Sequence, residues 1–452
     1  MSPIAFLRER FKAFGGDAAF IWKDQVFSYT RLLESVDRWR SRLDSWGLIP
    51  GQVVFLRADF TPEAAALFLA LAEARAILVP TTEAASAETE ERASVSQCEI
   101  RIDLGADDVP RLVKNSTTAN HELYRKLREA NRAGLVLFSS GSGGKPKAVV
   151  HDLESLLEKF KVVRHRRRTL LFLLFDHIGG INTMLYTLSN GGGLVPVADR
   201  KPENVLSLIE KHSVETLPTT PTFLNMILLS GAYERYPLQS LKLVTYGTEP
   251  MPESTLKKFH VTYPHIELLQ TYGLSELGIL RSKSKSSDSL WVKVGGEGFE
   301  TRVVEGLLQV KARSAMLGYL NAPSPFTEDG WFMTGDAVET DGEYLRILGR
   351  KSGWINVGGQ KVNPVEVESV IREMPEVADV TVTAGKNYLL GSYVSATVTP
   401  KELKEEPAVF AKRLKRFCAG RLEAYKVPVK VEFASEEPQV TARFKKERNS
   451  HA

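Results

Sequence analysis

A run of small polar residues and lysines near residue 140 has the composition of a phosphate-binding loop. An apolar segment, residues 135–138 (LVLF), leads into residues 139–147 (SSGSGGKPK). Glycines allow close backbone approach and expose N–H groups, while hydroxyls and ammonium groups donate to phosphate oxygens. The loop departs from the Walker pattern G-x-x-x-x-G-K-[ST], because its glycines are too close to Lys145 and Pro146 follows. Taken alone, such a stretch is also typical of a flexible loop. The candidate phosphate ligands are Ser139, Ser140, Gly141, Ser142, Gly143, Gly144 and Lys147.

The segments around this loop alternate between helix and strand patterns. Residues 27–43 place Leu32, Val36, Trp39 and Leu43 on one helical face. Apolar strands are predicted at 52–56 and 76–79, with a helix at 62–74 between them. The alternation recurs as a strand at 170–175, a helix at 182–188, a strand at 193–197 and a helix at 203–212. Strand–helix–strand units of this length predict parallel pairing with crossover helices.

The pattern changes after about residue 290. Short strands at 307–312 and 344–348 read as hairpins, and Asp341-Gly342 is a turn signal. About a hundred further residues have their own strand and helix pattern, including a helix at 365–372. We therefore expect an α/β protein with two domains. Residues 1–350 form a large domain of parallel-sheet subdomains plus a short β-rich subdomain, and residues 351–452 form a small, mobile α+β domain.

Composition excludes several classes of protein. The chain has 452 residues, 43% hydrophobic and 25% charged, which is unlike a disordered or fibrous protein. Two cysteines, Cys98 and Cys418, exclude a disulfide framework and a cysteine zinc site. The net charge of +4 comes without a basic stripe, so a nucleic-acid partner is not expected. We expect no membrane span and no signal peptide, and hence a cytoplasmic protein.

Five segments in order resemble the motifs of the acyl-adenylate-forming superfamily, which includes acyl-coenzyme A synthetases, peptide-synthetase adenylation domains and luciferases. Residues 139–149 resemble its phosphate signature [ST]-S-G-[ST]-[TG]-G-x-P-K-G-V, with Ala148 for the last glycine. Residues 246–250 (YGTEP), 272–276 (YGLSE) and 334–336 (TGD) resemble G-[AG]-E-P, Y-G-x-T-E and T-G-D. Residues 349–368 resemble G-R-x-x-x-x-I-x-x-x-G-x-x-V-x-P-x-E-I-E. The resemblance spans about residues 20–448.

The resemblance implies ligand roles for these segments. Tyr272 and Gly273 are expected at adenine, and Gly247, Thr248 and Glu249 at the adenine and acyl end. Asp336 and Arg350 are expected to bind the ribose. Ser275 and Ser142 are expected to donate to phosphate, and Glu276, with Ser142, to hold Mg²⁺ that bridges the phosphates of ATP.

The resemblance also implies roles for the smaller domain. Residues 438–448 fit a family pattern P-x-T-x-x-G-K-x-x-R, which makes Lys445 the catalytic lysine and Lys446 the fallback. Phe444 stands where glycine is usual. The small domain of the family rotates between two half-reactions, with a hinge near 350–353, here at Ser352. Gly358 and Gly359 are expected to face the pantetheine channel after that rotation.

The residues that select the acid are ambiguous. Residues 175–180 (FDHIGG) stand where acyl-coenzyme A ligases often show F-H-x-x-G and amino-acid-activating relatives show F-D. We favour His177 as the residue at the site, because Gly179 and Gly180 follow it. Asp176 is the alternative, as a partner for a substrate ammonium, and it also fits as a cap of the next helix. A basic run, Arg164 and residues 166–168, is either a solvated face or a site for phosphates or a carrier protein.

These features together predict a two-step ligase. A small carboxylic acid reacts with Mg-ATP to give an acyl-adenylate, and the thiol of coenzyme A then takes the acyl group. One alternative keeps the fold but loads an acyl or aminoacyl group onto the phosphopantetheine of a carrier protein. Another is a nucleotide-binding protein without catalysis, suggested by Phe444 and Ala148. The sequence does not identify the acid or the oligomeric state.

Overall fold

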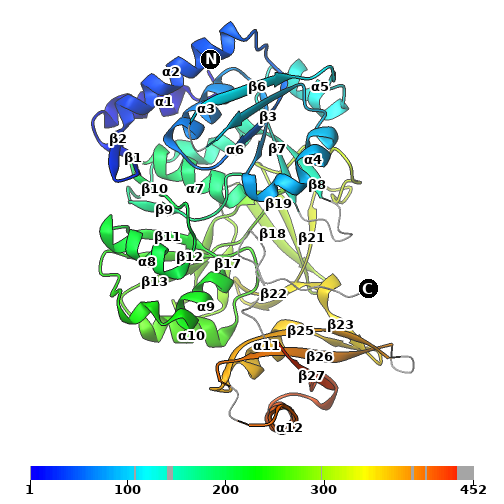
Figure 1. Ribbon diagram of the computed structural model, residues 1–452. Helices are drawn as coiled ribbons and strands as arrows, with labels where there is room; N and C mark the ends of the chain where they lie inside the picture. Colours follow the sequence, from blue (N-terminus) through cyan, green and yellow to red (C-terminus); the bar gives the residue numbers. More distant parts are fainter. Residues whose placement is uncertain are drawn as a thin grey trace.

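The computed structural model describes residues 2–105, 108–139, 146–296, 298–387, 391–402 and 405–434. Figure 1 shows a large N-terminal part and a smaller C-terminal sheet below it. Within these ranges, no helix is both long and apolar enough to cross a bilayer. Cys98 and Cys418 are free and buried. Most of the predicted phosphate loop, residues 140–145, and the predicted catalytic lysine, Lys445, lie outside the described residues.

The first seven-stranded sheet carries the start of the phosphate loop. Its central strands are parallel, whereas the strands at both edges are antiparallel. The predicted strands at 52–56 and 76–79 are confirmed as parallel neighbours, with Val53 opposite Ile77. In spatial order the strands are β20 (Gly318–Tyr319), β8 (Lys147–Asp152), β7 (Gly134–Ser139), β4 (Ile77–Thr81), β3 (Val53–Ala58), β5 (Ile100–Leu104) and β6 (Pro110–Lys114).

Helix α3 (Pro62–Glu73) shows why the predicted crossover forms. Thr61 caps it by accepting from the N–H of Ala64, and Pro62 occupies the first turn, where its missing N–H costs nothing. Nine consecutive residues, 64–72, are buried, and all are alanine, leucine or phenylalanine, so the helix lies inside the protein. The other helices around this sheet are α4 (Thr89–Val95), α5 (Glu122–Glu129) and α6 (Leu153–Leu157), with short 3₁₀ turns at Glu83–Glu88 and Glu158–Lys161.

The second seven-stranded sheet is also mainly parallel, and one apolar core joins it to the first sheet through α3 and α7. Its order is β13 (Glu267–Gln270), β12 (Leu243–Tyr246), β11 (Thr216–Thr219), β9 (Thr169–Leu171), β10 (Leu194–Pro196), β1 (Ala18–Trp22) and β2 (Gln25–Ser28). Its helices are α1 (Ala5–Phe14), α2 (Tyr29–Ser45), α7 (Ile178–Ser189), α8 (Pro202–Lys211), α9 (Pro221–Ser230) and α10 (Glu253–Thr262), with a 3₁₀ turn at Ala232–Glu234.

A six-stranded antiparallel sheet follows, as the hairpin pattern after residue 290 predicts. The turn at Asp341-Gly342 joins β21 to β22, which pair from Asp341 opposite Tyr344 to Asp336 opposite Arg350. The sheet order is β16 (Ser282–Ser284), β17 (Trp291–Val294), β22 (Tyr344–Arg350), β21 (Phe332–Asp341), β19 (Leu307–Ala312) and β18 (Phe299–Val304). A separate hairpin pairs β14 (Gly273–Leu274) with β15 (Gly278–Ile279).

The C-terminal sheet packs its own apolar core against two helices, α11 (Pro364–Ile371) and α12 (Pro407–Ala419). A 3₁₀ turn at Lys351–Gly353 links it to β22, and another lies at Ala424–Lys426. The strands are β23 (Ile355–Val357), β24 (Gln360–Val362), β25 (Val377–Asn387), β26 (Gly391–Pro400) and β27 (Lys430–Phe433). The predicted fold class is therefore confirmed, while the division at residue 350 stays a prediction.

Candidate functional site

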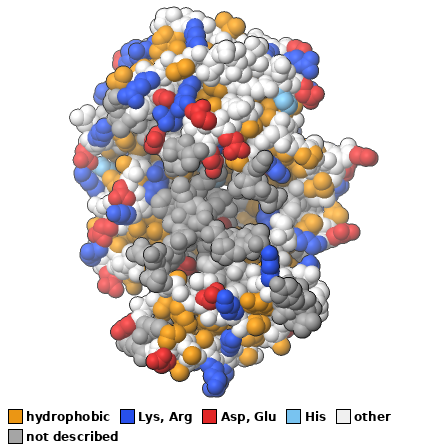
Figure 2. Space-filling view, turned by 45° about the vertical axis from the view of Figure 1, so that its right-hand side comes forward, with side chains coloured by type: hydrophobic (Ala, Val, Ile, Leu, Met, Phe, Trp, Pro, Cys, Tyr) orange, Lys and Arg blue, Asp and Glu red, His pale blue; other side chains and the backbone are white. Residues whose placement is uncertain are grey.

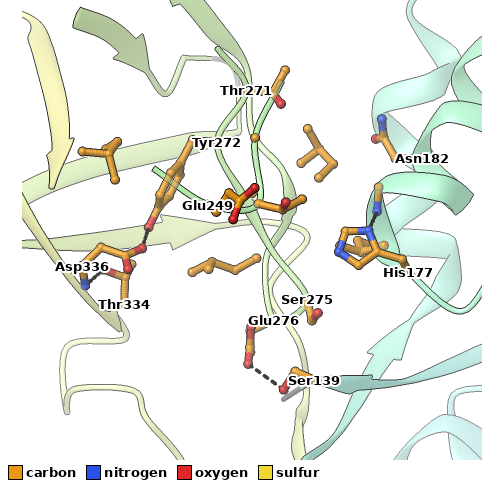
Figure 3. A pocket seen from close by; sticks show the side chains of 18 of the residues that line it. Ser139, His177, Asn182, Glu249, Thr271, Tyr272, Ser275, Glu276, Thr334 and Asp336 are labelled. Carbon is orange, nitrogen blue, oxygen red and sulfur yellow. Dashed lines mark hydrogen bonds between the residues drawn. The ribbon is translucent and has the colours of Figure 1, made fainter. Parts of the chain in front are cut away.

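A pocket of about 350 Å³ lies where the three N-terminal sheets meet. The carboxyl ends of β11, β12 and β13 form one wall, because loops after parallel strands gather at one edge of the sheet. The N-terminus of α7 forms the opposite wall, and β21 and β22 form the outer side. Figure 3 shows Asp336 and Tyr272 on one side of the pocket, with His177 and Asn182 across from them.

Asp336, Arg350 and Tyr272 form a polar cluster at the outer side. Since Asp336 and Arg350 are direct partners across β21 and β22, the Arg350 Nε reaches Asp336 Oδ1 at 3.0 Å. The hydroxyl of Tyr272 donates to Asp336 Oδ2 at 2.6 Å. The backbone N–H of Asp336 donates to Thr334 Oγ1, which fixes the turn before it. The two motifs around Asp336 and Arg350 thus meet through strand register.

Burial shifts the protonation equilibria of this cluster. It raises the pKa of Tyr272 well above its usual value, and the neighbouring Asp336 carboxylate adds to the shift. Burial also raises the pKa of Asp336, against the lowering effect of Arg350. The neutral phenol of Tyr272 is therefore a hydrogen-bond donor to the carboxylate of Asp336. A further donor, such as a sugar hydroxyl, would stabilise the ionised form of Asp336.

Glu276 is held at the inner end of the pocket. Its Oε1 accepts from the hydroxyls of Tyr319 at 2.9 Å and Ser139 at 3.4 Å, and the side chain is buried. The ammonium of Lys147 lies over the Tyr319 ring, 5.3 Å from its centroid. Glu276 therefore contacts Ser139, the last residue of β7. Through Tyr319 it also lies close to Lys147, the first residue of β8.

The donor set fits a magnesium ion that travels with ATP. Mg²⁺ takes few protein carboxylates and completes its coordination with water and phosphate oxygens. Glu276 is one such carboxylate, and its Oε1 is already fixed by two hydroxyls. Among the described residues no group of three or more His, Cys, Asp or Glu side chains is placed to hold a metal by itself. Ser142, the other predicted ligand, lies outside them.

His151 was not anticipated from the sequence as a site residue. It lies on β8, fully buried, and its Nε2 donates to the carbonyl of Ser275 at 2.6 Å. Burial lowers the pKa of His151, so the ring is neutral. This contact ties the strand after the phosphate loop to residues 275–276. No spacing in the sequence signals it, because the two residues are 124 positions apart.

The loop at residues 247–249 requires its glycine. A Cβ on Gly247 would lie 2.6 Å from the carbonyl oxygen of Thr271, so only glycine permits this approach of two strand ends. Thr248 adopts a positive φ of 73°. The carboxylate of Glu249 accepts from the N–H of Thr222, in the first turn of α9, at 2.9 Å. All three residues of this predicted loop line the pocket.

The structure separates Asp176 from His177. His177 lines the pocket, and its Nδ1 caps α7 by accepting from the N–H of Gly179 at 3.0 Å. The alternative that Asp176 caps this helix is wrong. Asp176 points away, is 2% exposed, and pairs with Arg92 on α4 at 2.9 Å. Gly180 lets α7 start here, because a Cβ would lie 2.1 Å from the carbonyl oxygen of Leu174.

The remaining predicted residues fall into three groups. Ser139, Lys147, Gly273 and Ser275 line the pocket. Gly358 and Gly359 do not line it; they form the turn between β23 and β24, and nothing lies within 4 Å of a Cβ on either. Residues 140–145 and Lys445 lie outside the described residues. Figure 2 shows acidic and basic side chains interspersed over this face of the molecule.

Comparisons with known proteins agree with this arrangement. The family model described as "AMP-binding enzyme" matches residues 7–298, and that of the "AMP-binding enzyme C-terminal domain" matches residues 366–445. Among curated proteins, the long-chain-fatty-acid–CoA ligase FadD13 of Mycobacterium tuberculosis is 29% identical over 328 residues, covering 67% of this chain and 64% of that protein. The indoleacetate–CoA ligase of Aromatoleum aromaticum is 27% identical over 333 residues, covering 68% and 64%.

Solved structures share the fold over nearly the whole chain. The anthranilate CoA ligase AuaEII in complex with anthranoyl-AMP has a TM-score of 0.80 at 20% identity, covering 98% of this chain and 95% of that one. The o-succinylbenzoate CoA synthetase of Bacillus subtilis, with its acyl-adenylate intermediate, has a TM-score of 0.78 at 20% identity, covering 98% and 97%. The sequence alignments, in contrast, span only 64% of the length of the first curated relatives.

Proposed function

Because this chain belongs to the AMP-binding enzyme family, we propose that it activates a carboxylic acid with ATP and transfers the acyl group to the thiol of coenzyme A. The observation that carries the proposal is the pocket with Asp336, Arg350 and Tyr272 at one end and Glu276 at the other. We assign the ribose to the end of this space with Asp336 and the phosphates to the end with Glu276. Curated relatives are named as CoA ligases of fatty and aromatic acids.

In the first step, a carboxylate oxygen of the acid attacks the α-phosphorus of ATP, and pyrophosphate leaves. Asp336 accepts from the ribose hydroxyls and Arg350 holds Asp336 in place. Tyr272 and the strand ends at 247–249 border the base. Glu276 would hold the divalent cation that accompanies ATP, which would supply charge neutralisation on the phosphates. Lys445 would bind the carboxylate and the developing phosphorane negative charge.

In the second step, the thiol attacks the acyl carbon and AMP leaves. We assign to His177, which lines the pocket at the start of α7, the gating of the thiol path to the acyl carbon. We assign the hinge to Ser352, in the 3₁₀ turn Lys351–Gly353, since small residues accommodate a backbone rotation. Rotation there would bring the turn at Gly358 and Gly359 towards the thiol path. The division of the chain near residue 350 belongs to this proposal.

An amino acid substrate held by Asp176 is not favoured. Asp176, the sequence candidate for pairing a substrate ammonium, is paired with Arg92 instead and does not line the pocket. Loading of a plain acyl group onto a carrier protein remains the alternative acceptor reaction. The two acceptors are distinguished by the second half-reaction alone.

The test measures acid-dependent pyrophosphate exchange over a panel of acids, followed by thioester formation with coenzyme A or a phosphopantetheinylated carrier protein. Asp336→Asn should raise the KM for ATP by about tenfold or more, since a charged acceptor to two hydroxyls is lost. Asp341→Asn is the matched control, because Asp341 is on the same strand but pairs with Lys285 at the surface. No exchange with any acid, in a folded protein that binds ATP, would refute the proposal.

A further inference from the structure

A second cavity, of about 510 Å³, opens directly behind the nucleotide pocket. The two cavities adjoin each other, since six residues line both: Asn182, Thr183, Pro218, Thr245, Thr271 and Ile279. The second cavity is large enough for a ligand of its own. Since the shared residues lie on the acyl side of the nucleotide pocket, the second cavity extends the acyl site.

Residue spacing shows the direction of this cavity. On α7 the lining residues advance from Asn182 through Tyr186 to Asn190, one helical face over eight residues. That face is about 12 Å long at 1.5 Å per residue. On β12, Leu243 and Thr245 line the cavity, while the intervening Val244 packs into the core on the other face of the sheet. The cavity therefore runs between α7 and the sheet, away from the nucleotide.

The wall of this cavity is cationic. Its lining includes Lys159, Arg164, Arg167, Arg281 and Arg313. Glu158, the carboxylate among the described lining residues, is engaged by Lys161 at 2.5 Å. Within the part of the chain that the structure describes, none of the five cations forms a salt bridge. Of the basic run at 164–168, Arg164 and Arg167 line this cavity, whereas Arg166 is exposed and pairs with Asp17.

Lys159 is the cation nearest to the junction of the two cavities. Its Nζ donates to the carbonyl of Ile279 at 3.0 Å, and Ile279 lines both cavities. Burial lowers the pKa of Lys159 to about 8, because no neighbouring carboxylate offsets the cost of desolvation. A buried ammonium with only a carbonyl partner can donate a further hydrogen bond to an anion.

The cavity wall also carries hydroxyl groups without partners. Thr187 and Thr216 are 2% and 8% exposed, and neither Oγ1 has a hydrogen-bond partner among the described residues. Unpaired buried hydroxyls are costly, so a site that keeps them suits a polar ligand better than a plain hydrocarbon tail.

We propose that the acid activated by this enzyme carries a second anionic group at the end distal to its reacting carboxylate, and that Lys159 and the arginines of this cavity bind it. The inference rests on the proposed function, since it names the substrate class of that reaction. A distal carboxylate and a distal phosphate share the chemistry that these cations recognise. The distal group must lie on the side of the acyl carbon away from ATP.

The experiment compares α,ω-dicarboxylic acids with monocarboxylic acids of the same chain length in acid-dependent pyrophosphate exchange, and includes ω-phosphono acids. Exchange needs no coenzyme A, so phosphates of the coenzyme do not contribute. We expect kcat/KM to be at least about tenfold higher for the acids with a distal anion, through a lower KM. Equal kcat/KM for both series would overturn the inference while leaving the proposed ligase reaction intact. Exchange with no acid would refute the ligase itself.

Variants assign the effect to residues. Lys159→Met keeps an apolar stem but removes the charge, and should raise the KM for the distal-anion acid by about 30-fold while leaving monocarboxylic acids within about threefold. Arg281→Gln, at an exposed position, should act in the same direction and does not disturb the interior. Lys12→Met is the control, because Lys12 is exposed on α1 and does not line the cavity. If Lys159→Met and Arg281→Gln affect both acid series equally, the cations do not bind the acid.

Discussion

At the scale of single residues, the site depends on a few charges whose partners are fixed before any ligand arrives. Asp336 has a phenol and a guanidinium donor, and Glu276 has two hydroxyl donors. Each carboxylate is held in one orientation, which lowers the cost of ordering it on binding. Lys159 has no such charged partner among the described residues, which is what distinguishes it as a ligand-binding cation.

Replacing Glu276 should separate metal-dependent from metal-independent binding. Glu276→Gln keeps the shape and one acceptor oxygen but loses the charge that a hard divalent cation requires. We expect the Mg-ATP-dependent exchange rate to fall by about 10²-fold or more, with AMP affinity changed by less than about threefold. Steady-state exchange and calorimetry measure the two quantities. Glu267→Gln, at an exposed position of β13, is the control. Equal losses of both quantities would argue against a metal role.

Lys159 should give acid binding a pH dependence. Since an ammonium is charged below its pKa, the KM for a distal-anion acid should be flat below pH 8 and rise above it. The charged neighbours around the cavity are Glu158 on the same turn, the segment 164–167 and the two arginines Arg281 and Arg313. These carboxylate and guanidinium charges do not change between pH 7 and 9.5.

Two variants check the origin of this pH profile. Lys159→Arg should keep the KM flat to about pH 9.5, because a guanidinium stays charged. His165→Gln should leave the rise above pH 8 in place. A rise that persists in Lys159→Arg would assign the titration to another group.

At the scale of elements, α7 connects the two halves of the acyl site. Its first turn brings His177 to the nucleotide pocket, and its later turns line the second cavity. The helix is held at its start by the His177 cap and, one residue earlier, by the buried Asp176–Arg92 pair. Arg92 also reaches Glu88 at 2.7 Å, so α4 and the start of α7 are fixed together.

Asp176 and His177 should therefore have opposite effects on stability and catalysis. Asp176→Ala leaves a buried guanidinium without this partner, and should lower the free energy of unfolding by about 3–5 kcal/mol with the kinetics of surviving enzyme largely unchanged. His177→Ala should lower it by about 1 kcal/mol through loss of the cap and should impair the thioester step. Denaturant unfolding and the two half-reactions measure these effects.

The double variant gives the control for this pair. Arg92→Met combined with Asp176→Ala should cost less than the sum of the single changes, because no buried charge remains unpaired. Additive losses would show that the pair does not act as a unit. A selective adenylation defect in Asp176→Ala would restore the amino acid alternative.

At the scale of the whole molecule, the C-terminal sheet has its own core and is joined to β22 by a short turn. Asn363, at the start of α11, donates to the carbonyl of Leu348 in β22 at 3.0 Å. A short linker between two parts with separate cores suits the rotation between half-reactions that we propose.

Lys445 should act in only one of these half-reactions. Lys445→Ala should slow acyl-adenylate formation by about 10²–10³-fold, because a group that stabilises the transition-state charge is lost. Thioester formation from supplied acyl-adenylate should stay near the wild-type rate. Single-turnover assays of each step measure both rates. Lys446→Ala is the control, and near-normal adenylation by Lys445→Ala would move the role to Lys446.

Sequence by itself determined the α/β class, the family and most of the nucleotide pocket. The α/β class follows from apolar periodicity, which sets each strand and helix. The family follows from the resemblance of five ordered motifs to those of a known superfamily, and parallel topology gathers motif residues that stand at strand ends. The pairing of Asp336 with Arg350 also follows locally, because both lie on one hairpin closed by Asp341-Gly342. Glu249 and Tyr272 line the same pocket because they follow the carboxyl ends of two neighbouring parallel strands, β12 and β13.

Tertiary structure alone decided which charges have partners and which face the acid. Asp176 and His177 are adjacent in sequence, yet one is buried against Arg92, 84 residues away, while the other faces the pocket. Likewise, Lys159 is one of many lysines in the sequence. Only its hydrogen bond to the carbonyl of Ile279, 120 residues away, shows that it lies at the junction of the two cavities. Such contacts depend on how elements pack across the fold, and no periodicity or short motif encodes that packing.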